Sequence, residues 1–261
     1  MSTPVSCRRY LGFDRLELDS SENRNALSID LLTRLLAAVR SSAAGPARGL
    51  LLTHTGPAFC AGVDLKERST LDRDDDTHSR LLAALLRRLW AHPRPVVAMV
   101  DGAVRGGGLG LLACADVVIA TERSTFAYSE ARVGVAPALV MAVTLPVSSS
   151  RRLLPHLLDA RTFGTETARE LGLVTSVVPT GDKSSLDDTL HALRSGAPDA
   201  QATIKRLVRD WVGTDVDALV QEMTSLSAEL FAGEEAAEGM AAFAQRRAPS
   251  WLTDPEGDMP S

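Results

Sequence analysis

The stretch DGAVRGGGLGLLACADVVIA, Asp101 to Ala120, decides the fold class of this chain of 261 residues. An apolar strand over Pro95 to Val100 runs into it, and the three glycines Gly106 to Gly108 are expected to open a helix. A further strand follows at Val117 to Ala120. A strand, a helix and a second strand in this order predict a βαβ connection, in which the two strands lie parallel in one sheet.

The segments before this stretch repeat the same alternation. Ser28 is a candidate N-cap for a helix in which the leucines of IDLLTRLLAAV recur at helical spacing, and Gly49 to His54 is a short apolar strand. An amphipathic helix is expected over Ser79 to Trp90. Arg8 to Leu18 is expected to be a strand with a turn or bulge at Gly12. The sequence therefore predicts an α/β fold with a mainly parallel sheet.

The character of the chain changes after about Ser184. Three helical stretches rich in Ala, Leu and Glu follow without a clear strand between them: Asp199 to Val212, Asp215 to Leu230 and Glu234 to Arg247. We therefore predict an α/β core over residues 1–195 and a helical region over residues 196–261.

Composition argues against several classes of protein. Apolar residues make up 45% of the chain and the formal net charge is −5, with basic and acidic residues interspersed. This balance argues against a nucleic-acid or membrane-surface protein. The longest apolar run, Val135 to Val147, is too short to span a bilayer. Three scattered cysteines and an N-terminus without an apolar signal segment favour the cytoplasm, and they suggest neither a disulfide framework nor a metal site.

Two short segments are suited to hydrogen bonding through the backbone. In FCAGVDLK, Phe59 to Lys66, the small pair Ala61 and Gly62 allows a tight turn that exposes N–H groups. In VRGGGLG, Val104 to Gly110, a strand gives way to a helix, whose first N–H groups have no partner within the helix. Taken alone, each segment is better explained as an ordinary glycine turn.

Taken together and in order, these segments resemble the crotonase, or enoyl-CoA hydratase/isomerase, superfamily. The resemblance covers nearly the whole chain. Besides the two turns and the opening stretch, it rests on ENRNAL at residues 22–27, FAYSEARVGVAP at 126–137, GLVTSVVP at 172–179 and EEAAEGMAAFAQRRAPSW at 234–251. It implies a spiral of ββα units followed by a C-terminal helical region that mediates assembly into trimers or hexamers.

The resemblance also implies a binding site for a coenzyme A thioester. The backbone N–H groups of Val63 and Gly107 match the oxyanion hole, which stabilises the negative charge that develops on the thioester oxygen. Asp64 lies in the first turn, where capping of local amides is the stronger interpretation. The positions that match substrate or coenzyme A contacts are Ala61, Asp64, Leu65, Lys66, Gly106, Phe243 and Arg246.

Each of these outer positions has a plainer interpretation. Lys66 matches a position near the adenine and its phosphates, and Arg246 matches a basic residue that reaches the nucleotide of a neighbouring subunit. As residues alone, both read equally as solvated surface charges. Phe243 is as compatible with core or interface packing as with a shared pocket.

The acid–base residues depart from the pattern of the family. Its hydratases usually carry two glutamates, and here the second is present as Glu130 while Gly110 stands at the position of the first. One buried carboxylate can still take up and return a proton. Hydration of an enoyl-CoA by Glu130 is therefore expected, while double-bond isomerisation and decarboxylation of an acyl-CoA remain open.

A non-catalytic acyl-CoA-binding or assembly protein is the alternative from another class. The two turns argue against it, because a scaffold has little use for an oxyanion hole. The expected ligand is an acyl-CoA thioester, or its counterpart on an acyl carrier protein, and no cofactor is implied beyond the coenzyme A of the substrate.

Overall fold

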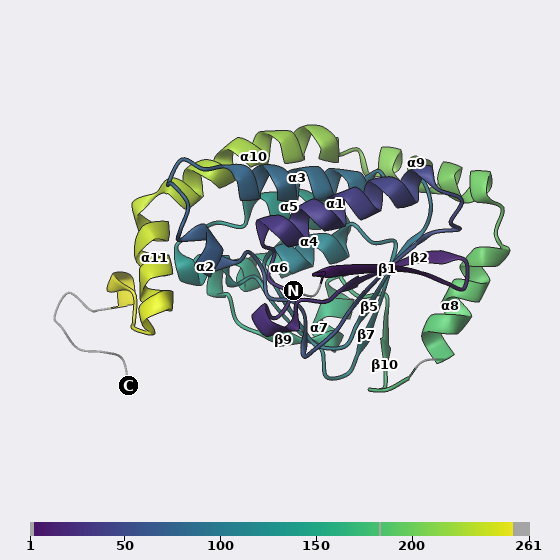
Figure 1. Cartoon of the computed structure of the whole chain (residues 1–261), viewed down its shortest axis with the longest axis horizontal. Helices are drawn as coiled ribbons and strands as arrows, with labels where there is room; N and C mark the ends of the chain where they lie inside the picture. Colours follow the sequence, from purple (N-terminus) through teal and green to yellow (C-terminus); the bar gives the residue numbers. More distant parts are fainter. Residues whose placement is uncertain (1–2, 183, 253–261) are drawn as a thin grey trace.

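The computed structural model describes residues 3–182 and 184–252 (Figure 1). Its larger sheet has the strand order β1-β2-β3-β5-β7-β10, and all neighbouring strands are parallel except β1 and β2. This confirms the predicted α/β class with a mainly parallel sheet. The strands are β1 (Val5–Tyr10), β2 (Phe13–Leu18), β3 (Leu50–His54), β5 (Val96–Val100), β7 (Val117–Thr121) and β10 (Ser176–Val178).

The first two strands form a hairpin. Leu11 and Gly12 both have positive φ, at 45° and 87°, as a two-residue turn of this hairpin type requires. The turn expected at Gly12 is therefore present, and it divides the expected segment into two antiparallel strands.

The structure also contains a second, smaller sheet, which was not predicted from the sequence. It has the order β4-β6-β8-β9, in which β4, β6 and β8 run parallel and β9 is antiparallel. Each strand has only two or three residues, which is too short to show a pattern in sequence. They are β4 (Ala58–Cys60), β6 (Ala103–Arg105), β8 (Thr125–Ala127) and β9 (Phe163–Gly164).

Five helices pack together to form a layer over one face of the larger sheet (Figure 1). Ser28 caps the first of them, as predicted, because its Oγ accepts from the N–H of Leu31 at 3.2 Å. The helices are α1 (Ile29–Ala44), α3 (Thr77–Trp90), α4 (Gly107–Ala113), α5 (Ala138–Thr144) and α10 (Val216–Ala232).

The opposite face of the sheet is covered by helix α8 (Ser184–Ser195). Leu51 packs with Leu190 of α8 on this side, whereas Leu50 and Leu52 belong to the main core on the other side. A parallel strand buried on both faces reads as a continuous apolar run, which explains the sequence LLL in β3.

The remaining helices are shorter or lie toward the C-terminus of the chain. The predicted boundary between residues 195 and 196 falls at the end of α8, yet α10 packs on α3 and α5 of the core. The remaining helices are α2 (Leu65–Arg68), α6 (Ser150–Asp159), α7 (Thr165–Glu170), α9 (Pro198–Val212) and α11 (Glu234–Gln245), with 3₁₀ turns η1 (Ser21–Asn23), η2 (Ser129–Val133), η3 (Leu145–Val147) and η4 (Ser250–Leu252).

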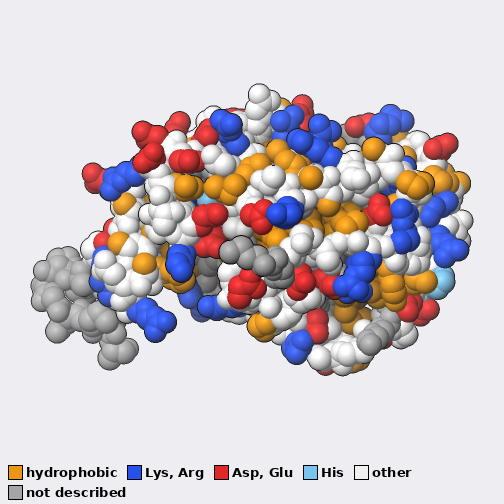
Figure 2. All heavy atoms as spheres, in the orientation of Figure 1, with side chains coloured by type: hydrophobic (Ala, Val, Ile, Leu, Met, Phe, Trp, Pro, Cys, Tyr) orange, Lys and Arg blue, Asp and Glu red, His pale blue; other side chains and the backbone are white. Residues whose placement is uncertain are grey.

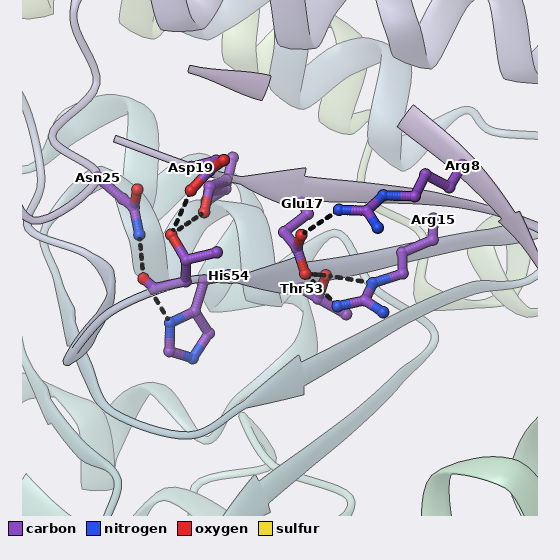
Figure 3. A network of polar contacts seen from close by, with 9 residues as sticks. Arg8, Arg15, Glu17, Asp19, Asn25, Thr53 and His54 are labelled. Atoms are coloured by element: carbon purple, nitrogen blue, oxygen red, sulfur yellow. Dashed lines mark hydrogen bonds and ion pairs between the residues drawn. The ribbon is translucent and has the colours of Figure 1, made fainter. Parts of the chain in front are cut away.

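A buried asparagine fixes the loop between β2 and α1 (Figure 3). Asn25 adopts a positive φ of 54°, a conformation that asparagine tolerates better than most residues. Its Oδ1 accepts from the N–H of Ser20 at 2.7 Å, and its Nδ2 donates to the carbonyl oxygens of Thr55 and Ala58 at 3.0 and 2.8 Å. The loop is therefore tied to both ends of the segment that joins β3 to β4.

Acidic and basic side chains are interspersed over the face that Figure 2 shows. No helix in the described part of the chain is both long enough and apolar enough to cross a bilayer.

Candidate active site

The first glycine turn joins β4 to α2 and is fixed by a bridge to the loop at Leu27. Gly62 has φ +89°, and its carbonyl oxygen accepts from the N–H of Leu27 at 2.7 Å. In this parallel bridge the groups on either side of Val63 make the bonds, so the N–H of Val63 itself points away from Leu27. That N–H has no acceptor among the described residues.

Asp64 is occupied by local contacts. Its Oδ1 accepts from the N–H of Glu67 at 3.1 Å and caps α2, and its Oδ2 accepts from Nδ2 of Asn23 at 3.2 Å. This matches the capping expected from its place in the turn. Asp64 thereby holds the first turn to the loop that precedes α1.

The second glycine turn joins β6 to α4. Gly106 has φ +48° and ψ −121°, a conformation that a side chain strongly disfavours. Gly107 is the first residue of α4, and its N–H, like that of Val63, has no acceptor within the described chain.

The two turns meet because β4 and β6 are parallel neighbours, so their carboxyl ends lie at the same edge of the small sheet. A Cβ added to Gly62 would lie 3.4 Å from the carbonyl oxygen of Arg105 and 3.7 Å from Cα of Gly106. The structure therefore brings the two turns predicted to form an oxyanion hole into contact.

Glu130 comes from the next strand of the same sheet. It lies in η2, just beyond β8, which runs parallel to β6. A Cβ added to Gly106 would lie only 2.9 Å from Oε1 of Glu130, so the carboxylate is beside the second turn. Its Oε2 is inaccessible to solvent and has no hydrogen-bond partner in the described structure. Burial raises the pKa of Glu130 to about 7.

One cavity of about 30 Å³ joins these groups. Among the described residues that line it, Glu130 is the only charged one, and most of the others are apolar. They are Val63, Leu82, Gly107, Glu130, Val135, Ala136, Pro137, Ala138, Leu139, Val140, Ser227 and Phe231. The three residues predicted to be catalytic thus share a cavity, and their roles stay predictions.

The position of the missing first glutamate faces hydrocarbon. A Cβ added to Gly110 would lie 3.2 Å from Cδ2 of Leu86 and 3.7 Å from Cγ2 of Val140. Val140 itself lines the cavity. The side of the cavity next to α4 therefore provides packing in place of a second carboxylate.

With this geometry in hand, comparison with known proteins identifies the family. The sequence model of the enoyl-CoA hydratase/isomerase family matches residues 11–254. This chain belongs to that family.

Relatives and solved structures agree with this assignment. The chain is 32% identical to the enoyl-CoA hydratase ACTT6 of Alternaria alternata, over 89% of this chain and 78% of that protein. It is 31% identical to the mevalonyl-coenzyme A hydratase sidH of Aspergillus fumigatus, over 90% of each. The crystal structure of an enoyl-CoA hydratase from Mycobacterium avium superposes with a TM-score of 0.81 at 35% identity, over 96% of this chain and all (100%) of that one. The crotonase-like fold is thereby confirmed, and the C-terminal helices are consistent with a trimerisation region.

The residues that the family resemblance assigns to coenzyme A lie outside the cavity. Lys66 is exposed on α2, Phe243 is 64% exposed on α11, and Arg246 is exposed at the C-terminal cap of that helix. Ala61, Leu65 and Gly106 belong to the two turns or adjoin them without lining the cavity. Their contacts with substrate stay predictions.

Sequence reasoning missed the contribution of α10 to the cavity. This helix supplies Ser227 and Phe231, and Ser227 is hydrogen-bonded to Ser79 of α3. The available signal was a lone serine on the apolar face of each helix, since Ser79 and Ser227 are both buried.

Replacing Gly106 with alanine tests the close approach of the second turn to Glu130. The added Cβ would displace the carboxylate and would strain a backbone that favours glycine, at a cost of about 1–3 kcal/mol in unfolding free energy. In this family member we expect the activity to fall about 100-fold or more, because a displacement of about 1 Å at a catalytic group has effects of that size.

Gly181→Ala is the matched control, because Gly181 also has a positive φ but no atom lies within 4 Å of the added Cβ. Urea denaturation and activity assays on both variants separate backbone strain from the clash. Equal activity in the two variants would show that the contact with Glu130 is unimportant.

The buried carboxylate predicts how stability depends on pH. The pKa of Glu130 is raised from 4.5 to about 7 in the folded chain, so between these values the folded state binds more protons than the unfolded state. Unfolding free energy should therefore fall as pH rises through this window, by up to about 3 kcal/mol from this group. Urea denaturation at about pH 5 and pH 8.5 should show a larger fall for the wild type than for Glu130→Gln. Parallel changes in the two proteins would mean that Glu130 is solvated.

Proposed function

We propose that this protein is an enoyl-CoA hydratase that uses the single glutamate Glu130 as both base and acid. The observation that carries the proposal is the shared cavity, in which a carboxylate whose buried Oε2 has no partner in the described structure adjoins residues with two free backbone N–H groups. The hydratases among its relatives support the same reaction class.

In the proposed reaction the thioester oxygen accepts hydrogen bonds from the N–H groups of Val63 and Gly107. Glu130 takes a proton from water while the water oxygen adds to Cβ, and the electron pair of the double bond moves toward the thioester oxygen. Glu130 then returns the proton to Cα. Each oxyanion donor of this kind contributes about 3 kcal/mol to transition-state stabilisation.

The raised pKa of Glu130 suits both halves of this cycle. A carboxylate with a pKa of about 7 is partly ionised at neutral pH and holds a proton more firmly than an ordinary glutamate. General acid–base catalysis is most effective when the pKa lies near the working pH. Burial in an apolar cavity therefore supports one group serving in two steps.

Double-bond isomerisation is the second candidate, and the observation that favours it is the apolar surrounding of Gly110. Isomerisation needs a base that moves one proton along the acyl chain and no second group to hold water. Decarboxylation of an acyl-CoA would use the same oxyanion hole. Both alternatives pass through an enolate, which forms by loss of a proton in isomerisation and by loss of CO2 in decarboxylation, whereas in hydration it forms when water adds to Cβ.

The proposed substrate is an acyl-CoA thioester, with an acyl carrier protein as the other carrier to test. Exposed Lys66 and Arg246 are proposed to contact the nucleotide end, Phe243 to pack beside it, and the turn residues Ala61 and Leu65 to flank the thioester arm. The proposed reaction uses no metal or redox cofactor. A reducing compartment such as the cytoplasm is proposed from the three unpaired cysteines.

Proton NMR in deuterated water tests the reaction directly. The purified protein is given crotonyl-CoA and, separately, a 3-enoyl-CoA, with Glu130→Gln as the paired variant. We expect 3-hydroxyacyl-CoA from crotonyl-CoA, and a loss of about 100-fold or more in Glu130→Gln, as for other general acid–base residues.

Other outcomes point elsewhere. Migration of the double bond with deuterium uptake but without a hydroxyl product would assign the enzyme as an isomerase. If neither substrate changes, carrier-bound and decarboxylatable substrates are the next to test. If Glu130→Gln leaves every tested activity unchanged, the non-catalytic alternative gains.

We also propose assembly into trimers or hexamers through the C-terminal helices. Helix α9 exposes an apolar stripe at helical spacing. Trp211 in this stripe is 91% exposed, and the other members are Ile204, Leu207 and Val208. Exposed apolar patches of this kind commonly mark interfaces between proteins.

Sedimentation tests the assembly. The wild type is expected at three or six times the 27.8 kDa mass of the chain, and Trp211→Asp is expected to shift it toward the monomer. Leu158→Asp on α6, also exposed, serves as the control that should leave the mass unchanged. A monomeric wild type would contradict the proposal.

A further inference from the structure

Ser227 is the second polar side chain of the cavity. Among the described residues that line it, only Glu130 and Ser227 carry polar side-chain atoms. Ser227 is 5% exposed, and its Oγ lies 3.2 Å from Oγ of Ser79, which is 6% exposed. The hydroxyl comes from α10 and its partner from α3, and these two helices pack against each other along the core.

The serine pair leaves Ser227 free to accept another hydrogen bond. A hydroxyl has one donor and two acceptor positions. If Ser227 donates to Ser79, both of its lone pairs stay free, and if it accepts from Ser79, one stays free. In either arrangement Oγ of Ser227 can accept a hydrogen bond from a group in the cavity.

The cavity has the size and the chemistry to bind one water molecule. A water needs at least about 10–15 Å³ of such space and two or more polar partners. This cavity offers about 30 Å³, with Oε2 of Glu130 unpaired and Ser227 among its lining residues. The other side chains among the described lining residues are apolar, so Glu130 and Ser227 are the two whose side chains could hydrogen-bond to a water there.

We propose that Ser227, held by Ser79, is a positioning residue that orients the water activated by Glu130. This inference rests on the proposed hydratase function. One O–H of the water gives its proton to Glu130 and the oxygen forms the new bond to Cβ, while the other O–H donates a hydrogen bond to Ser227. Ser227 exchanges no proton, so the proton that Glu130 takes from water is the one it delivers to Cα.

The chain needs such an anchor because Gly110 provides no second carboxylate. With one hydrogen bond, to Glu130 alone, the water could rotate about it and point its lone pair away from Cβ. A second fixed contact removes that freedom, and orientation of this kind is a recognised source of rate enhancement. A hydroxyl supplied by α10 thus takes over the orienting half of a second glutamate's work.

The test compares two reactions that differ in their need for water. Hydration of crotonyl-CoA requires the oriented water, whereas exchange of the α-proton of butyryl-CoA in deuterated water requires only Glu130 and the oxyanion donors. In Ser227→Ala we expect kcat for hydration to fall about 10- to 100-fold with KM nearly unchanged. Exchange should stay within about threefold of the wild type, because proton abstraction by Glu130 is intact.

Two further variants complete the design. Ser227→Thr retains the hydroxyl and is expected to restore most of the hydration rate, which a purely structural role would not predict. Ser225→Ala lies on the same helix but is exposed, and it should change neither reaction. Thermal denaturation of all variants checks that folding is unaffected.

The outcomes separate this inference from the function on which it rests. If the wild type hydrates crotonyl-CoA and Ser227→Ala changes both reactions equally or neither, the inference is wrong and the hydratase proposal stands. If the wild type exchanges the α-proton but hydrates no enoyl-CoA, the hydratase proposal fails and the inference fails with it.

Discussion

The contact between the two glycine turns is the constraint on which the site depends. Gly62 approaches the backbone at Arg105 and Gly106 so closely that a side chain there would already touch it. The contact arises because β4 and β6 are parallel and end at one edge of the small sheet, and β8 ends beside them with Glu130. Three short strands therefore deliver two free N–H groups and one carboxylate to the same place. The N–H of Gly107 is free because the first residues of a helix have no partner within it, and the N–H of Val63 is free because it points away from the bridge to Leu27.

Hydrogen bonds from Asn25 and Glu67 help to hold the first turn in this arrangement. Asn25 fixes the loop before α1, and that loop gives Leu27 as the partner of the first turn. Glu67 then ties three helices together, since its Oε2 accepts from the N–H of Ile29 and contacts Nε2 of His78, both at 2.8 Å. Networks in which each polar group has a partner are rigid, whereas an unpaired group in the same setting is costly. The side chains of Asn25 and Glu67 thus hold the first turn and its neighbouring helices in place beside the free N–H of Val63.

Much of the fold and of the candidate site could be predicted from the sequence, and the features that were missed were missed for physical reasons. The helices α1, α3, α9, α10 and α11, the cap at Ser28 and the apolar strands of the larger sheet carry local signals and were predicted, whereas the 12-residue helix α8 was not. The small sheet carries none, because strands of two or three residues are too short to show alternation. The family motifs predicted that Val63, Gly107 and Glu130 belong together, and the structure places them around one cavity. Ser227 was missed because it meets Ser79 only through the packing of α10, 148 residues further along the chain.

Hydrocarbon surrounds position 110 and also makes up most of the cavity that Glu130 lines. A second carboxylate at position 110 would bring charge and hydration into the cavity, whereas Leu86 and Val140 fill that side with hydrocarbon. The same exclusion of water leaves Oε2 of Glu130 unsolvated and raises its pKa to about 7. In the mechanism proposed above, the hydroxyl of Ser227 on α10 orients the water, which the apolar lining of the cavity cannot do. The proposal for Ser227 thus gives the helices that follow the α/β core a part in the reaction as well as in the packing.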